Sequence, residues 1–107
     1  MKKMDPGEFR KYLEHTSIGP VTFQYQDQDW YDSFGVTSEF HCVFPKINMD
    51  ICPTLLTLSG ADTCVRFHGI DYIQVNRERG EILVHCKARL PDCLPGERTY
   101  TLSVNMQ

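Results

Sequence analysis

The sequence predicts an α+β domain that is mainly β, with an N-terminal helix followed by about six or seven antiparallel strands forming a roll, a barrel or a small sandwich. Three observations support this prediction. Apolar residues follow a helical spacing only within about residues 5–15, they alternate with polar residues from residue 21 onward, and turn signals containing Gly or Pro separate the alternating runs. The chain of 107 residues is predicted to form a single domain, because this length suits one modest core.

The predicted helix has a clear start at Asp5-Pro6-Gly7-Glu8. Asp5 can cap the first turn, Pro6 suits the first helical position, and Glu8 stands three residues after Asp5, as in a capping box. An apolar stripe at helical spacing follows, made of Phe9, Tyr12 and Leu13. We expect the helix to run to about His15 and Gly19-Pro20 to prevent its continuation.

The alternating runs predict strands over residues 21–25, 39–44, 54–59, 63–68, 72–76, 81–90 and 100–106. The clearest run is EILVHCKARL at 81–90, which the turn RERG at 77–80 joins to the preceding strand as a hairpin. Gly69 suits a bulge or bend. PKINMDICP and LPDCLPGE, which hold four of the six prolines, are predicted to be loops, with brief strand pairing over residues 47–51 as the open alternative. With nearest-neighbour connections throughout, a parallel sheet is not expected, because it needs helical crossovers that this sequence lacks.

The negative charge is concentrated in one part of the chain. The net charge is −3, and residues 12–45 contain five acidic residues and no Lys or Arg. The centre of this region is YQDQDWYDSFG at 25–35. Trp and Tyr dominate protein–protein hot spots, and carboxylates steer a basic partner toward them. The predicted partner-binding residues are Asp27, Asp29, Trp30, Tyr31 and Asp32.

Two other interpretations of this segment stay open. Trp30 can be a core residue, since the single tryptophan of a small domain is often buried. The carboxylates of Asp27, Asp29 and Asp32 can coordinate Ca²⁺ or Mg²⁺, although the glycine and the terminal glutamate of an EF-hand loop do not follow at the required spacing.

Histidine and cysteine side chains offer a candidate zinc site. His41, Cys64, His68 and His85 all fall in the polar phase of their predicted strands, so neighbouring strands would bring them together. The alternative is a set of solvent-facing side chains on a polar sheet face. His68 and Cys64 also share one strand face, which leaves a catalytic dyad open.

The cysteine spacing predicts reduced thiols and no disulfide framework. None of the five cysteines forms a CxxC pair, and their number is odd. Cys42 and Cys86 lie in the apolar phase and are predicted to be core residues. The histidine that precedes each of them points to the opposite strand face, which excludes a dyad between neighbours.

Several function classes are not expected. Arg66, Arg77, Arg79, Lys87 and Arg89 form a broken basic stripe that Glu78 and Glu81 interrupt, and the chain is net acidic, so we expect no direct nucleic-acid binding. No stretch approaches the length of a membrane span, and no signal peptide is apparent, so we expect a cytoplasmic protein without a membrane role. P-loop, GxGxxG, GxSxG and HExxH motifs are missing, and we expect no cofactor.

The sequence therefore predicts a non-enzymatic protein-interaction module that binds through its acidic, aromatic segment at about residues 25–39. The partner is another copy of the chain or a basic protein that this chain inhibits or recruits as an adaptor. Two alternatives stay open: a small metal- or ligand-binding β-barrel with a His/Cys site, and a structural subunit or homo-oligomer that assembles through edge strands.

Overall fold

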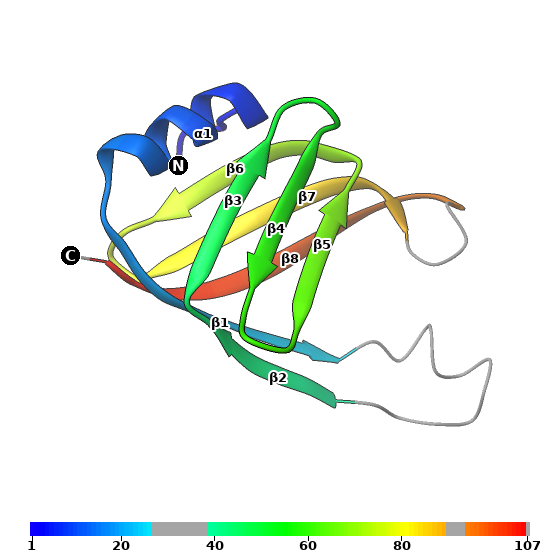
Figure 1. Ribbon diagram of the computed structural model, residues 1–107. Coiled ribbons are helices and arrows are strands. Elements are labelled where there is room, and N and C mark those ends of the chain that lie inside the picture. The colour runs from blue at the N-terminus through cyan, green and yellow to red at the C-terminus, as the bar shows by residue number, and fades with distance from the viewer. Residues whose placement is uncertain (27–38, 90–93, 107) are drawn as a thin grey trace.

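A computed structural model describes residues 1–26, 39–89 and 94–106 (Figure 1). Within them, one helix precedes eight strands, which confirms the α+β, mainly β prediction with a higher strand number. The helix is α1 (Pro6–His15), and the strands are β1 (Ile18–Gln26), β2 (Glu39–Phe44), β3 (Lys46–Asp50), β4 (Leu55–Ser59), β5 (Cys64–His68), β6 (Ile70–Asn76), β7 (Glu81–Arg89) and β8 (Leu94–Met106).

The strands form two antiparallel sheets that pack face to face. The five-stranded sheet has the order β2-β1-β8-β7-β6, and the three-stranded sheet has the order β3-β4-β5. Figure 1 shows the three-stranded sheet lying across β6, β7 and β8, with α1 beside β3 and β6. Of the three predicted arrangements, this is the small sandwich, because the strands stay in two separate sheets and do not close into a barrel.

One strand pairing differs from the nearest-neighbour connections that the sequence suggests. β1 pairs with β8, near the other end of the chain, with Val21 opposite Val104 and Phe23 opposite Leu102. After β2 the chain crosses into the three-stranded sheet and returns to the five-stranded sheet at Gly69. Because β1 is the first strand and follows a helix, one of its sides has no sequential neighbour, and the last strand pairs with that side.

Two predicted loops contain strand residues. β3 occupies PKINMDICP, where Ile47 and Met49 pair with Leu58 and Leu56. Alternation over five residues is a weak signal beside flanking prolines, which explains why the sequence favours a loop there. β8 begins at Leu94 and not near residue 100, and Pro95 pairs with Ala88 where the register shifts. A bulge of this kind accommodates a proline inside a sheet.

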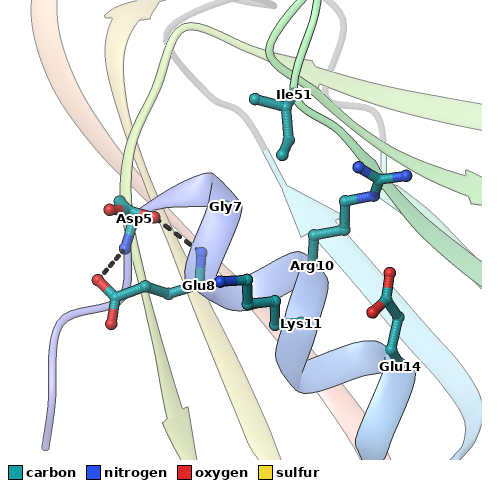
Figure 2. Close-up of a pocket in the computed structure, with 7 residues that line it drawn as sticks. All are labelled: Asp5, Gly7, Glu8, Arg10, Lys11, Glu14 and Ile51. Atoms are coloured by element: carbon teal, nitrogen blue, oxygen red, sulfur yellow. Dashed lines mark hydrogen bonds between the residues drawn. The ribbon is translucent and has the colours of Figure 1, made fainter.

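The start and end of α1 agree with the prediction. Asp5 is the N-cap: its carboxylate accepts a 2.8 Å hydrogen bond from the Glu8 backbone N–H, and Glu8 accepts a 3.4 Å bond from the Asp5 N–H (Figure 2). The helix ends at His15, and Gly19 and Pro20 belong to β1. Phe9 is fully buried and the rest of the predicted stripe is partly buried.

The core joins both sheets and the helix. Phe67 of β5 stacks on Phe23 of β1 with ring centroids 5.2 Å apart, and its centroid lies 5.1 Å from that of Tyr100 in β8. Phe9 of α1 enters the same cluster, and α1 contacts β3 and β6. Side chains from every layer therefore share one apolar core, as expected for a domain of this size.

Two glycines set the bends that the sequence predicts. Gly80 ends the RERG turn with φ +63°, and a Cβ there would lie 2.7 Å from the Val104 carbonyl oxygen. Gly69 has φ 64° and lies between β5 and β6, next to a register shift between Ile70 and Tyr72. Both backbone conformations favour glycine because they place φ in the left-handed region.

Candidate functional site

The predicted partner-binding segment connects two strands of the five-stranded sheet. Asp27, Asp29, Trp30, Tyr31 and Asp32 lie outside the described residues. The strands on either side are described: β1 and β2 pair in regular antiparallel register from Val21 opposite Phe44 to Gln26 opposite Glu39. The acidic segment therefore joins the ends of a hairpin that is part of the sandwich.

The hairpin lies at one edge of the five-stranded sheet. β2 is the terminal strand, and no described strand pairs with its outer side. Figure 1 shows β1 and β2 extending past the three-stranded sheet, with β2 at the margin of the molecule. An edge strand presents unpaired backbone N–H and C=O groups that can pair with another chain.

The side chains of β2 are described for Cys42, Val43 and Phe44. Val43 is one of the most exposed large apolar residues in the described part of the chain, with 52% of its surface accessible, and it lies beside Thr22 on the outer face of the sheet. Cys42 is half-buried and Phe44 is fully buried on the opposite face. The strand contains neither lysine nor proline, two residue types that commonly protect an edge.

The other sheet edges are covered or charged. At the opposite edge of the five-stranded sheet, Met4 and Ile73 exchange two 2.8 Å backbone hydrogen bonds, so the N-terminal segment pairs with β6. In the three-stranded sheet, α1 packs along β3, and β5 presents exposed Arg66 and His68. No described strand pairs with the outer side of β2, and its sequence has one Asp, Glu, Lys or Arg residue, Glu39.

A polar and aromatic ladder crosses the outer face of the five-stranded sheet. The ammonium group of Lys3 lies 4.4 Å from the centroid of the Tyr72 ring, and this ring stacks on His85 at 4.1 Å. His85 Nε2 lies 3.0 Å from Gln74 Oε1, and Nδ1 lies 2.8 Å from Thr99 Oγ1. Both ring nitrogens thus have polar partners, which suits a structural role better than metal coordination.

Sequence reasoning places His85 on the polar face but does not identify this ladder. The contact between Tyr72 and His85 is predictable from the RERG turn at 77–80, because a hairpin with this turn places these two residues opposite each other. The position of Lys3 has no comparable local signal, since it depends on the N-terminal segment pairing with β6.

Two of the predicted zinc ligands, His68 and His85, belong to different sheets. His68 lies at one end of β5 and His85 lies in β7, on the outer faces of opposite sheets. His41 is opposite Gln24 in the register, and its side chain lies outside the described residues. Within the residues that the structure describes, no three His, Cys, Asp or Glu side chains could hold a metal ion together.

The possible dyad of Cys64 and His68 is not formed. These residues are the two ends of β5, paired with Ser59 and Leu55 respectively. At about 3.3 Å per residue, they lie about 13 Å apart along the strand. A shared strand face is therefore insufficient for contact.

The cysteines differ in exposure. Cys86 is 3% exposed, and burial raises the pKa of its thiol to about 11. It is a core residue, as predicted, and stays protonated at neutral pH. Cys42 is only half-buried, and Cys52 and Cys64 are exposed and free.

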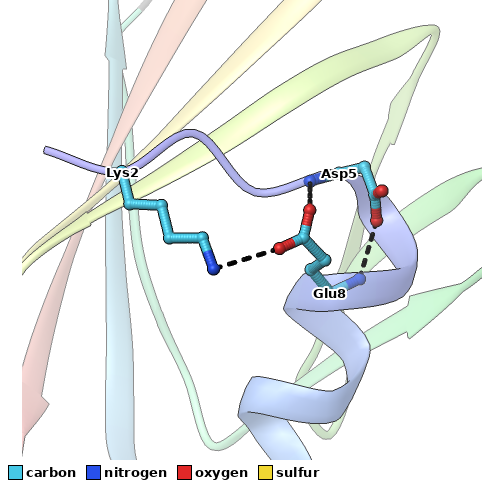
Figure 3. A network of polar contacts seen from close by, with 3 residues as sticks. All are labelled: Lys2, Asp5 and Glu8. Atoms are coloured by element: carbon cyan, nitrogen blue, oxygen red, sulfur yellow. Dashed lines mark hydrogen bonds and ion pairs between the residues drawn. The ribbon is translucent and has the colours of Figure 1, made fainter.

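A shallow depression of about 440 Å³ lies between α1 and the turn after β3 (Figure 2). Its lining is Asp5, Gly7, Glu8, Arg10, Lys11, Glu14 and Ile51. Lys2 and Glu8 form a 3.2 Å ion pair at its margin, and the capping box engages the carboxylates of Asp5 and Glu8 (Figure 3). The mixed charges and open shape favour no particular ligand class.

The basic residues of the β6–β7 hairpin are partly neutralised. Lys87 pairs across strands with Asp71 at 3.4 Å, and Arg79 lies 4.0 Å from Glu81. These contacts agree with the expected charge pairing on a solvated face.

Comparison with known proteins gives no match: no protein family, curated protein or solved structure resembles the chain. The single helix of the described residues is neither long nor apolar enough to cross a membrane.

Proposed function

We propose that the protein is a non-enzymatic interaction module that binds a basic protein partner at the β1–β2 end of its five-stranded sheet. The observation that carries this proposal is the position of β2, the terminal strand of the five-stranded sheet, which follows directly after the acidic, aromatic segment. Such a module serves as an inhibitor or an adaptor of its partner.

The charge distribution supports a basic partner. The region 12–45 contains five acidic residues and no Lys or Arg, and three of the acidic residues, Asp27, Asp29 and Asp32, lie within six positions of one another. A field of one sign raises the rate of encounter with a partner of the opposite sign. Trp30 and Tyr31 supply the residue types that anchor such a contact after encounter.

The free thiols favour a reducing compartment as the location of this function. Cys52 and Cys64 are exposed and unpaired, and exposed thiols persist best in a reducing compartment. We therefore propose that the protein acts in the cytoplasm.

Site-specific photo-cross-linking tests the proposal. A photoreactive residue replaces Trp30 in one variant and Thr57, on the outer face of the three-stranded sheet, in the control variant. We expect the first variant to cross-link a basic protein in cell extract, and we expect Asp29→Lys to remove this product. Equal products from both positions, or products that survive Asp29→Lys, would contradict the proposal.

A further inference from the structure

We infer that the outer edge of β2 binds an extended, basic segment of the partner as an added β-strand. This inference rests on the proposed function and deepens it, because it names the surface and the backbone conformation of the partner. The site consists of the outer-edge backbone groups of residues 39–43 and the exposed side chain of Val43.

The first argument is the contrast between the two edges of the same sheet. At β6, the chain itself supplies the extra pairing, through two 2.8 Å backbone bonds between Met4 and Ile73. At β2, no described segment supplies such bonds. Unpaired edge groups that lie beside an exposed apolar side chain are the surface that strand addition uses.

The second argument concerns what a new strand would touch. Its side chains would alternate between the two faces of the sheet. Those on the outer face would meet Val43, whose exposed surface would then be covered. Those on the other face would extend the sandwich beside Cys42, which is half-buried. An added strand therefore gains apolar contact on each face as well as backbone hydrogen bonds.

The third argument identifies the charge of the occupant. β1 and β2 together contain one Asp, Glu, Lys or Arg residue, Glu39, and the sequence from Tyr12 to Pro45 has no Lys or Arg. A second copy pairing through β2 would bring a second excess of the same sign to this edge, which opposes association. A strand rich in Lys or Arg gains from the same field.

The added strand forms a small interface. β2 has six residues, and pairing along it covers less than the ~1,600 Å² of a standard protein–protein interface. We therefore expect a transient complex whose affinity depends on salt concentration.

Calorimetry and amide hydrogen exchange of the full chain test this inference with two synthetic probes. The first probe is a peptide of alternating lysine and valine, which can form a strand. The second alternates lysine and proline, which keeps the charge but lacks half of the backbone donors and cannot pair regularly. We expect the first peptide to bind at least about tenfold more tightly and to protect backbone amides of residues 39–43 from exchange.

Two variants locate the contact. Val43→Lys introduces a residue type that protects edges and repels the basic strand, and we expect it to weaken binding of the lysine–valine peptide at least about tenfold. Thr101→Lys adds the same charge to an exposed position on the same face of the central strand β8, and we expect little change. Equal weakening by both variants would overturn the assignment to β2.

The outcomes separate this inference from the proposed function. If both peptides bind equally, without protecting β2 but with loss of binding in Asp29→Lys, the acidic surface binds a basic partner and strand addition is wrong. If neither peptide binds at low salt, the basic partner is wrong as well. If sedimentation shows a dimer whose β2 amides are protected without peptide, a second copy occupies the edge and the inference is overturned.

Discussion

At the scale of single residues, the environment of Cys86 has a measurable consequence. Burial raises the pKa of its thiol to about 11 in the folded protein, whereas the unfolded chain exposes a thiol with an ordinary pKa near 9. The contribution of the buried, neutral thiol to the stability of the folded protein is thus fully present below about pH 9. It decreases as the pH rises toward 11, because only the unfolded state then ionises.

We expect Cys86→Ala to remove this pH dependence. The variant loses packing, so its free energy of unfolding at pH 7.5 should be lower than that of the wild type. By pH 10 the difference in free energy of unfolding between the two proteins should be smaller, because only the wild type loses the contribution of the thiol. Urea unfolding at both pH values measures the difference. Cys64→Ser, at an exposed position, is the control and should show no narrowing. A constant difference for Cys86→Ala would contradict the expected thiol ionisation.

The residue scale also shows what sequence periodicity can predict. The buried phase of β7, Ile82, Val84 and Cys86, is the phase that alternation indicates. His85 is correctly placed on the other face, but its partners Gln74 and Thr99 come from two different strands. Periodicity assigns a face to each side chain. It does not say which side chains meet there, because that depends on pairing between strands.

At the scale of elements, the capping box of α1 is the most specific local feature. Asp5→Ala removes the carboxylate that accepts the Glu8 backbone N–H and should lower the free energy of unfolding by about 1 kcal/mol. Glu14→Ala is the matched control, since it removes an acidic side chain from the last turn, where no capping bond is lost. Chemical denaturation of both variants measures the effect, and equal changes would contradict a capping role.

Elements with a strong local signal were predictable, and those defined by pairing were not. α1 and its N-cap Asp5 contain a capping box and an apolar stripe within a short local stretch, and both were correctly identified. β3 and the start of β8 contain or adjoin prolines, and they are strands because β4 and β7 supply their partners. The candidate site follows the same rule: its acidic composition is visible in the sequence, but β2 is an edge strand because the next strand, β3, belongs to the other sheet.

At the scale of the whole molecule, the aromatic contact between the sheets is the feature on which the sandwich depends. Phe67 is the one member of the Phe23, Phe67 and Tyr100 group that comes from the three-stranded sheet. It is 3% exposed, and β5 otherwise presents three exposed side chains to solvent. We do not expect the three-stranded sheet to be stable by itself, because three short strands need one face packed against another layer.

We therefore expect Phe67→Ala to destabilise the entire domain by about 3–5 kcal/mol, a large fraction of the stability of a small protein. Val65→Ala, at a half-buried position of the same strand, should cost considerably less. Urea unfolding followed by far-UV circular dichroism measures both variants, and amide exchange reports each sheet separately. Because one core connects the sheets, their protection should decrease together in Phe67→Ala. Loss of protection confined to β3, β4 and β5 would show that the five-stranded sheet folds without them.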